Sequence, residues 1–220
     1  GEVLHLRDED RNAVWTPAPG PLGLSRTHRI HHGWGRSVLE TRSDGLEERV
    51  SWGLHPTLPA KIVGVRLRNT GSVTRRISAT YFADWVLGSH VSKTVGRLQV
   101  RFDRALSAVV ARNPYLPKFS KATAFLAADR GPDGMATDRD EFLGPNEPLD
   151  AVPEGLLRPA PGEREVPRRQ GCGALKVNLT LGPGESGEVR FYLGVVGEGA
   201  ELERALAGLR ERAESDPAEE

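Results

Sequence analysis

The stretch from Lys61 to Gly88, KIVGVRLRNTGSVTRRISATYFADWVLG, constrains the fold more than any other part of the chain. Apolar and arginine side chains alternate in its first half, which ends in the turn residues 69–72. In its second half, a period of two continues for eleven residues, with these side chains on one side: Ile77, Ala79, Tyr81, Ala83, Trp85 and Leu87. Eleven strand residues span about 35 Å, which is typical of a large sheet. We therefore predict a long hairpin at the centre of an all-β core.

Shorter alternating runs between turn residues predict further strands on both sides of this hairpin. They fall at residues 3–8, 26–30, on either side of a turn at 43–45, and at 95–102, 106–111, 122–128, 173–181 and 188–196. The segment 129–167 is rich in Gly, Pro and acidic residues and predicts a long loop. Loops of that length in compact domains are usually functional or disordered, so this segment is a candidate for function.

After Glu198 the spacing of apolar residues changes from the two-residue period of strands to a helical spacing. Leu202, Ala205, Leu206 and Leu209 recur at three and four residues, which predicts one amphipathic helix. We expect a β-domain over residues 1–196, followed over 197–220 by a linker helix and a charged tail that look like the start of a further part.

The charge balance and the single cysteine exclude several classes of protein. Thirty basic and thirty acidic residues give no net charge, so we expect neither a nucleic-acid partner nor membrane contact by this chain. Cys172 is the only cysteine, which excludes an intrachain disulfide and is consistent with a reducing compartment. No run resembles a signal peptide or approaches the roughly 20 apolar residues of a membrane span. We expect a soluble, cytoplasmic chain.

Three histidines cluster in the segment HRIHHGWG. His28 and His32 would lie about 13 Å apart along a strand, and His31 would face the other way, so they cannot share one metal ion. We predict an ordinary strand with locally bonded imidazoles, and a sugar-facing role for Trp34 or one histidine as the alternative.

Carboxylates crowd the segment ATDRDEFLG. In an extended chain, Asp138 and Asp140 would lie about 6.6 Å apart on one side, with Arg139 on the other. Neighbours on one strand cannot flank a glycosidic bond from opposite sides, so this pair is not a catalytic acid and base. Either the segment is a solvated turn, or it presents Arg139 or Asp138 to sugar hydroxyls.

Two aromatic residues beside prolines, Trp15 and Tyr115, are candidate stacking platforms for sugar rings, with a place in the core as the alternative. The sequence lacks the motifs of nucleophilic triads, phosphate loops and dinucleotide sites. We therefore predict no catalytic residue, no metal and no cofactor in this chain.

Several segments resemble, in order, the N-terminal β-supersandwich domain of glycoside hydrolase family 94, the family of cellobiose phosphorylase and of the phosphorylase-like region of cyclic β-1,2-glucan synthase. They are RDEDRNAVWTPAPGPLG, HRIHHGWG, VRLRNTGSVTRRISATYFADWVLG, ARNPY, AFLAADRGPDGMATDRDEFLG and CGALKVNLTLGPGESGEVRFYLG, and together they span about 190 residues. Trp34 departs from the pattern, which commonly has Phe there. The resemblance implies a large two-sheet antiparallel supersandwich, like that of galactose mutarotase, with a C-terminal linker helix.

The resemblance also implies that catalysis belongs to a domain that follows the β-domain. The family's catalytic Asp and phosphate-binding groups lie in a following (α/α)6 barrel, so inorganic phosphate would belong to that barrel. In family dimers the β-domain helps to wall the active site, and by position Arg139, Asp138 and Phe142 are the candidates for that wall. A parent related to cyclic-glucan synthase would lie in the inner membrane, with this domain on its cytoplasmic side.

We expect a non-catalytic domain of a β-glucan-processing glycosyltransferase or phosphorylase. It would support the barrel, a homodimer and the binding of a β-glucan oligosaccharide. The alternatives are a stand-alone carbohydrate-binding module and a self-sufficient mutarotase-like enzyme.

Overall fold

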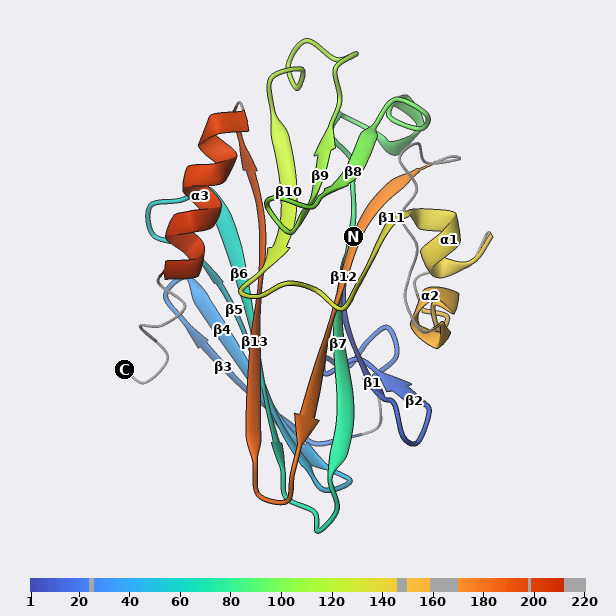
Figure 1. The fold of residues 1–220 in the computed structure, drawn as a ribbon, viewed down its shortest axis with the longest axis vertical. Coiled ribbons are helices and arrows are strands. Elements are labelled where there is room, and N and C mark those ends of the chain that lie inside the picture. Colours follow the sequence, from blue (N-terminus) through green and yellow to red (C-terminus); the bar gives the residue numbers. More distant parts are fainter. Residues whose placement is uncertain (24–25, 146–149, 159–169, 198, 212–220) are drawn as a thin grey trace.

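Two antiparallel β-sheets lie face to face (Figure 1). The computed structural model describes residues 1–220 except 24–25, 146–149, 159–169, 198 and 212–220. The smaller sheet has the order β11 (Gly134–Asp138), β12 (Gly171–Leu181), β7 (Arg75–Asp84), β1 (Glu2–Asp8), β2 (Ala13–Trp15). The larger has the order β3 (His28–Gly33), β4 (Arg36–Ser43), β5 (Leu46–Leu54), β6 (Ala60–Asn69), β13 (Ser186–Val196), β10 (Thr123–Ala128), β9 (Ala108–Arg112), β8 (Gln99–Asp103). The predicted all-β sandwich of two large sheets is confirmed.

Helices cover the outer faces of both sheets. On the eight-stranded sheet lies α3 (Gly199–Glu211), and on the five-stranded sheet, at the opposite side of the slab, lie the short helices α1 (Arg139–Leu143) and α2 (Glu154–Leu157) (Figure 1). The one 3₁₀-helix of the described chain is η1 (Val91–Lys93). The main core fills the space between the sheets, and smaller apolar clusters lie under α3 and under α1 and α2.

The predicted central hairpin is wrong in one respect, because β6 and β7 do not pair with each other. β6 belongs to the eight-stranded sheet and β7 to the five-stranded sheet, so the turn between them is an arch from one sheet to the other. The alternation is as expected, since Val63, Val65 and Leu67 face Ile77 and its neighbours across the core. A period of two shows which side chains share a face, but both a hairpin and an arch satisfy it.

β7 is also buried on both faces, which the alternating pattern did not indicate. The side chains of its odd-numbered residues from Ile77 to Ala83 face the main core, whereas Phe82 is fully buried under α1 on the other side. The strand ends at Asp84 rather than at Leu87, although Trp85 stays buried in the core beyond it. β12 and β13 form a second arch, and its turn bonds to the first: the Asn69 amide donates to the Glu185 carbonyl at 2.9 Å.

Other element bounds differ modestly from expectation. The predicted strand 95–102 begins only at Gln99, after η1, and residues 134–157 of the predicted loop contain β11, α1 and α2. The turn at 43–45 joins β4 and β5 as predicted, with Asp44 and Gly45 both at positive φ, the conformation of a two-residue hairpin turn.

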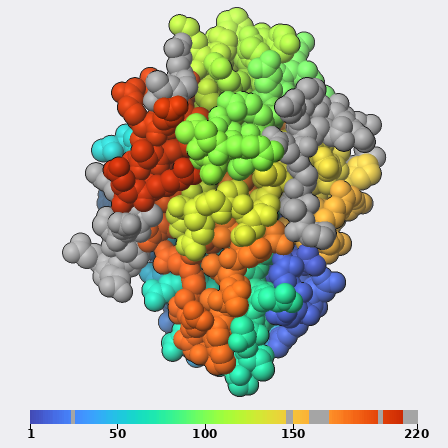
Figure 2. Space-filling model, in the orientation of Figure 1, coloured from blue at the N-terminus to red at the C-terminus, as the bar shows by residue number. Residues whose placement is uncertain are grey.

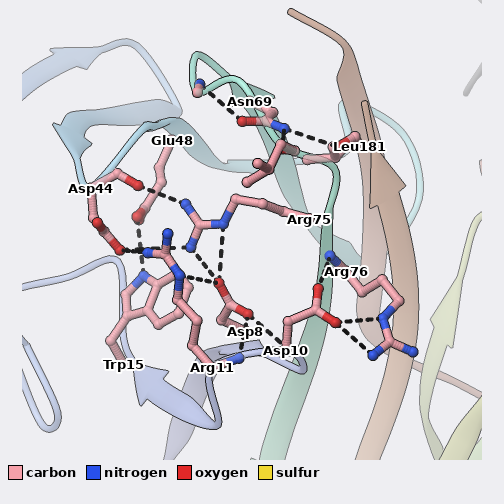
Figure 3. Close-up of polar contacts among 12 residues, drawn as sticks. Asp8, Asp10, Arg11, Trp15, Asp44, Glu48, Asn69, Arg75, Arg76 and Leu181 are labelled. Carbon is pink, nitrogen blue, oxygen red and sulfur yellow. Dashed lines mark hydrogen bonds and ion pairs between the residues drawn. The ribbon is translucent and has the colours of Figure 1, made fainter. Parts of the chain in front are cut away.

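A buried ionic network fastens the ends of β1, β4, β5 and β7 (Figure 3). The Arg75 guanidinium donates to the Asp8 carboxylate through Nε at 3.0 Å and to the backbone carbonyl of Asp44 at 2.7 Å. Burial acts to raise the pKa of Asp8, but the hydrogen bonds from Arg75 and nearby backbone amides outweigh it, and that pKa is lowered. The network therefore holds charged groups inside the slab by pairing them.

The C-terminal helix packs against the outer face of the eight-stranded sheet. The predicted inward side chains Leu202, Ala205, Leu206 and Leu209 are all buried against β10 and β13, which confirms the pattern. Arg210 donates to the carbonyl oxygens of Ala128 at 3.1 Å and Leu106 at 2.9 Å. In the space-filling view, α3 lies directly against the green segment that contains β8 and β9 (Figure 2).

Candidate functional site

A cleft opens between the two sheets at the end of the slab where β7 and β13 finish and β6 begins. Its volume is about 710 Å³, within the range of small-molecule sites. Both sheets contribute to its walls, and the charged groups that line it are Glu2, Lys61 and Asp84. We call it the end cleft.

An ion pair joins the two sheets at the end cleft. Lys61 of β6 places Nζ 2.5 Å from Oε2 of Glu2 on β1, and the Tyr81 hydroxyl donates to the same carboxylate oxygen. Burial acts to raise the pKa of Glu2, but the bonds from Lys61 and Tyr81 outweigh it and the pKa is lowered. Burial and the nearby carboxylate raise the pKa of Tyr81. Glu2 therefore stays ionised and is a hydrogen-bond acceptor.

Asp84, the last residue of β7, is the second carboxylate of the end cleft. Gln170 donates to its Oδ1 at 2.5 Å, and Nε of Arg139 lies 3.5 Å from its Oδ2. Burial raises the pKa of Asp84, and the positive charges of the N-terminal amino group and of Arg139 offset this only in part. A half-buried carboxyl group with a raised pKa in a cleft is a typical feature of functional sites.

Of the three residues predicted for the wall of a sugar site, only Arg139 reaches this cluster. The expected extended segment is wrong, because α1 begins at Arg139 and Asp138 caps it by accepting from the Glu141 amide at 3.1 Å. Phe142 is fully buried and stacks on Phe82, with ring centroids 5.1 Å apart. Asp138 and Phe142 are thus inside the protein, because α1 folds them against the sheet.

The three other predicted aromatic residues lie in different environments. For Trp15 the structure bears out the alternative of a place in the core: it is 3% exposed, and its indole N–H donates to Glu48 Oε1 at 3.1 Å. Trp34, in the turn from β3 to β4, is fully exposed, and Tyr115, in the loop after β9, is 65% exposed. Five strand spacings, about 24 Å, separate β4 from β9, so these two rings cannot stack on one sugar.

The histidine segment lies in a strand, as predicted, but this strand is β3 over residues 28–33 rather than 26–30, and it forms an edge of the eight-stranded sheet. The imidazole of His32 bonds to the Ser37 hydroxyl at 2.9 Å, and Nε2 of His31 lies 3.9 Å from Glu40. Among the residues that the structure describes, no group of three or more His, Cys, Asp or Glu side chains could hold a metal ion. Likewise, no helix in the described part of the chain has the length and apolar character needed to cross a membrane.

Sequence reasoning did not single out Glu2, Lys61 and Asp84, which line the end cleft. The alternating pattern assigned Asp84 to the solvent side of a strand, and Glu2 and Lys61 stand at strand starts without any motif. The available signal was the one carboxylate of the strand Arg75–Asp84, placed at its end directly before Trp85.

Comparison with known proteins identifies what the chain is similar to. Residues 1–212 match the family described as glycosyl hydrolase 94, supersandwich domain. The chain is 32% identical over 213 residues to the cyclic β-(1,2)-glucan synthase NdvB of Rhizobium meliloti, covering 96% of this chain and 8% of that protein. It is 28% identical over 215 residues to the N,N'-diacetylchitobiose phosphorylase of Vibrio proteolyticus, covering 90% of this chain and 26% of that protein.

A bacterial glucoamylase solved in complex with acarbose has the same fold at 6% identity, with a TM-score of 0.56 over 96% of this chain and 28% of its own. The likeness to this structure concerns the fold alone. The chain spans about a quarter or less of the length of both curated relatives.

Proposed function

The chain belongs to the supersandwich-domain family of glycosyl hydrolase 94, and from this membership we propose that it is a non-catalytic domain of a β-glucan-processing enzyme. The observation that carries the proposal is the match of residues 1–212 to this domain, in relatives that are much longer than the chain. The parent would be a glycosyltransferase or an inverting phosphorylase, acting on the cytoplasmic side of the inner membrane if it is a glucan synthase.

In this proposal the catalytic acid and the inorganic phosphate belong to an (α/α)6 barrel, and the domain supports that barrel and a homodimer. The end cleft is the observation that supports a role of this domain in binding the glucan. Its carboxylates Glu2 and Asp84 are already bonded to Lys61, Arg139 and Gln170, which fixes their orientation. Fixed charged acceptors suit hydrogen bonds to sugar hydroxyls, and no general acid and base need be assigned here.

The test compares the purified chain with the chain plus the barrel of the same parent. Titration with β-1,2-gluco-oligosaccharides in a calorimeter should give little heat with the chain alone and binding when the barrel is present. The chain alone should release no product from these glucans, with or without inorganic phosphate. Turnover by the isolated chain would identify a self-sufficient enzyme and contradict the proposal.

A second candidate, a stand-alone carbohydrate-binding module, is favoured by the exposed rings of Trp34 and Tyr115. It predicts that the isolated chain binds the oligosaccharides and that W34A or Y115A weakens binding. The scaffold proposal predicts instead that R139Q in the full-length parent raises KM, while R158Q, at an exposed arginine on the same side of the slab, leaves the kinetics unchanged. Unchanged kinetics in R139Q would remove Arg139 from the site.

A further inference from the structure

A shallow groove of about 690 Å³ lies on the outer face of the eight-stranded sheet, away from the end cleft. α3 covers one part of this face, including Ile62 of β6. Positions Arg66 and Arg68 of the same strand share that side but are exposed. Five arginines line the groove, and we call it the arginine groove: Arg29, Arg42, Arg49, Arg66 and Arg68.

Strand register brings like charges together in the middle of the arginine groove. Arg49 of β5 lies directly opposite Arg66 of β6, and Arg68 follows two residues along on the same face. Directly opposed side chains in antiparallel strands have Cβ atoms about 5 Å apart, and like charges at such positions are destabilising. The fold therefore maintains an unfavourable concentration of positive charge at Arg66.

The carboxylates of the groove do not neutralise Arg66. Glu40 pairs with Arg49 at 2.6 Å, and Glu47 pairs with Arg42 and, at 3.7 Å, with Arg68. The third carboxylate that lines the groove, Glu48, is buried and pairs with Arg26 at 2.6 Å. Glu188 faces Arg66 from β13, but its carboxylate bonds to Arg190 at 2.9 Å. Arg66 and Arg29 have no ion pair with any residue in the described part of the chain.

We propose that the arginine groove binds a small molecule through a phosphate group, with Arg66 at the centre and Arg49 and Arg68 beside it. Arginine's planar guanidinium matches phosphate oxygens in paired hydrogen bonds. A concave surface with excess positive charge attracts such an anion, and the volume fits a small molecule rather than a protein segment. Bound phosphate would relieve the repulsion at Arg66. This site is independent of the proposed function.

The test measures Tm and calorimetric binding of the purified chain with inorganic phosphate, glucose 6-phosphate, glucose, and sodium chloride at matched ionic strength. Both phosphate compounds should raise Tm above the chloride control, because a ligand that binds only the folded state stabilises it. Glucose should have no effect. Tighter binding of glucose 6-phosphate than of phosphate, by about tenfold or more, would identify a phosphorylated sugar as the ligand, and equal binding would identify free phosphate.

The variants R66Q and R66K separate binding from folding, and R112Q is the matched control, since Arg112 is an exposed strand arginine of the same sheet. R66Q should lose the phosphate response. Its Tm without phosphate should nevertheless equal or exceed that of the unsubstituted chain, because a like-charge contact is removed. R66K should keep part of the response, and R112Q all of it. Phosphate no better than chloride, an unchanged response in R66Q, or binding of a polyglutamate peptide without any phosphate response would overturn the proposal.

Discussion

Buried polar side chains in this protein fall into two groups with different energetic consequences. The Asp8 carboxylate is ionised and has a cationic partner, Arg75. His5 of β1 is 1% exposed, faces Phe142, and has Nδ1 without a hydrogen-bond partner. Burial without a partner lowers the pKa of His5 because it favours the neutral imidazole, whereas the pKa of Asp8 is lowered by its hydrogen-bond partners. Both residues therefore lose their stabilising effect as the pH falls, His5 at a higher pH than Asp8.

His5 should make stability depend on pH below neutrality. Burial lowers its pKa from 6.5 to about 4, so between these values the unfolded chain binds a proton that the folded chain does not. Stability from this residue is complete above pH 6.5 and is lost as pH falls towards 4, by up to about 3 kcal/mol. Urea unfolding of H5Q between pH 6.5 and 4 should lack this loss of unfolding free energy.

H32Q is the control for this measurement, because His32 is an exposed histidine on β3. The unfolding free energy of H32Q should depend on pH in the same way as that of the unsubstituted chain. If the unfolding free energies of the unsubstituted chain and of H5Q depended on pH in the same way, His5 would not be the source of the pH dependence.

The buried Arg75–Asp8 pair should be far more important for stability than its exposed neighbour, the pair Arg76–Asp10. R75M leaves the Asp8 carboxylate buried without its main partner, which typically costs about 3–5 kcal/mol. R76M should change the unfolding free energy little, because its pair is solvated and screened. Chemical denaturation of both variants tests this, and equal effects would contradict it.

At the scale of elements, the change from strand to helix at Asp138 decides which side chains of ATDRDEFLG are accessible. The segment leaves β11 and enters α1 within one residue, and the cap at Asp138 satisfies a helix amide. As a result Phe142 packs on Phe82, and Arg139 turns towards Asp84.

Asp138 should therefore act as a helix cap and not as a sugar ligand. D138A should destabilise the chain by about 1 kcal/mol, whereas D138N, whose side-chain oxygen still accepts the amide bond, should retain most of the stability. Thermal unfolding measures both. If D138N instead lost glucan binding in the full-length parent while keeping parental stability, a direct role in binding would be indicated.

For the whole molecule, the main question is whether α3 is part of the sandwich or only a linker. Its apolar side chains share a cluster with residues of β9, β10 and β13, and Arg210 bonds to carbonyl groups around β9 and β10. A helix held in this way should unfold together with the sheets.

L206A should lower the unfolding free energy of the entire domain by about 2–5 kcal/mol, the usual range for a buried leucine. E203A, on the exposed side of the same helix, should have little effect. Circular dichroism and tryptophan fluorescence should report one coincident transition in each variant. An early separate loss of helical signal in L206A would show that α3 is an independent linker.

The sequence alone determined the class of fold, the inward side chains of most strands, and the apolar side of the C-terminal helix. These are local properties, because side-chain alternation and helical spacing depend only on residues near each other in the chain. The segments that resemble the family gave its identity for the same reason, as each is a continuous run of residues.

Only the tertiary structure decided which strands pair and which polar groups meet. Alternation could not tell a hairpin from an arch at residues 69–75, nor show that Phe82 lies under α1. The approach of Lys61 to Glu2, and the opposition of Arg49 and Arg66, depend on register between distant segments. Register is set by packing over the whole sheet, and no local pattern contains it.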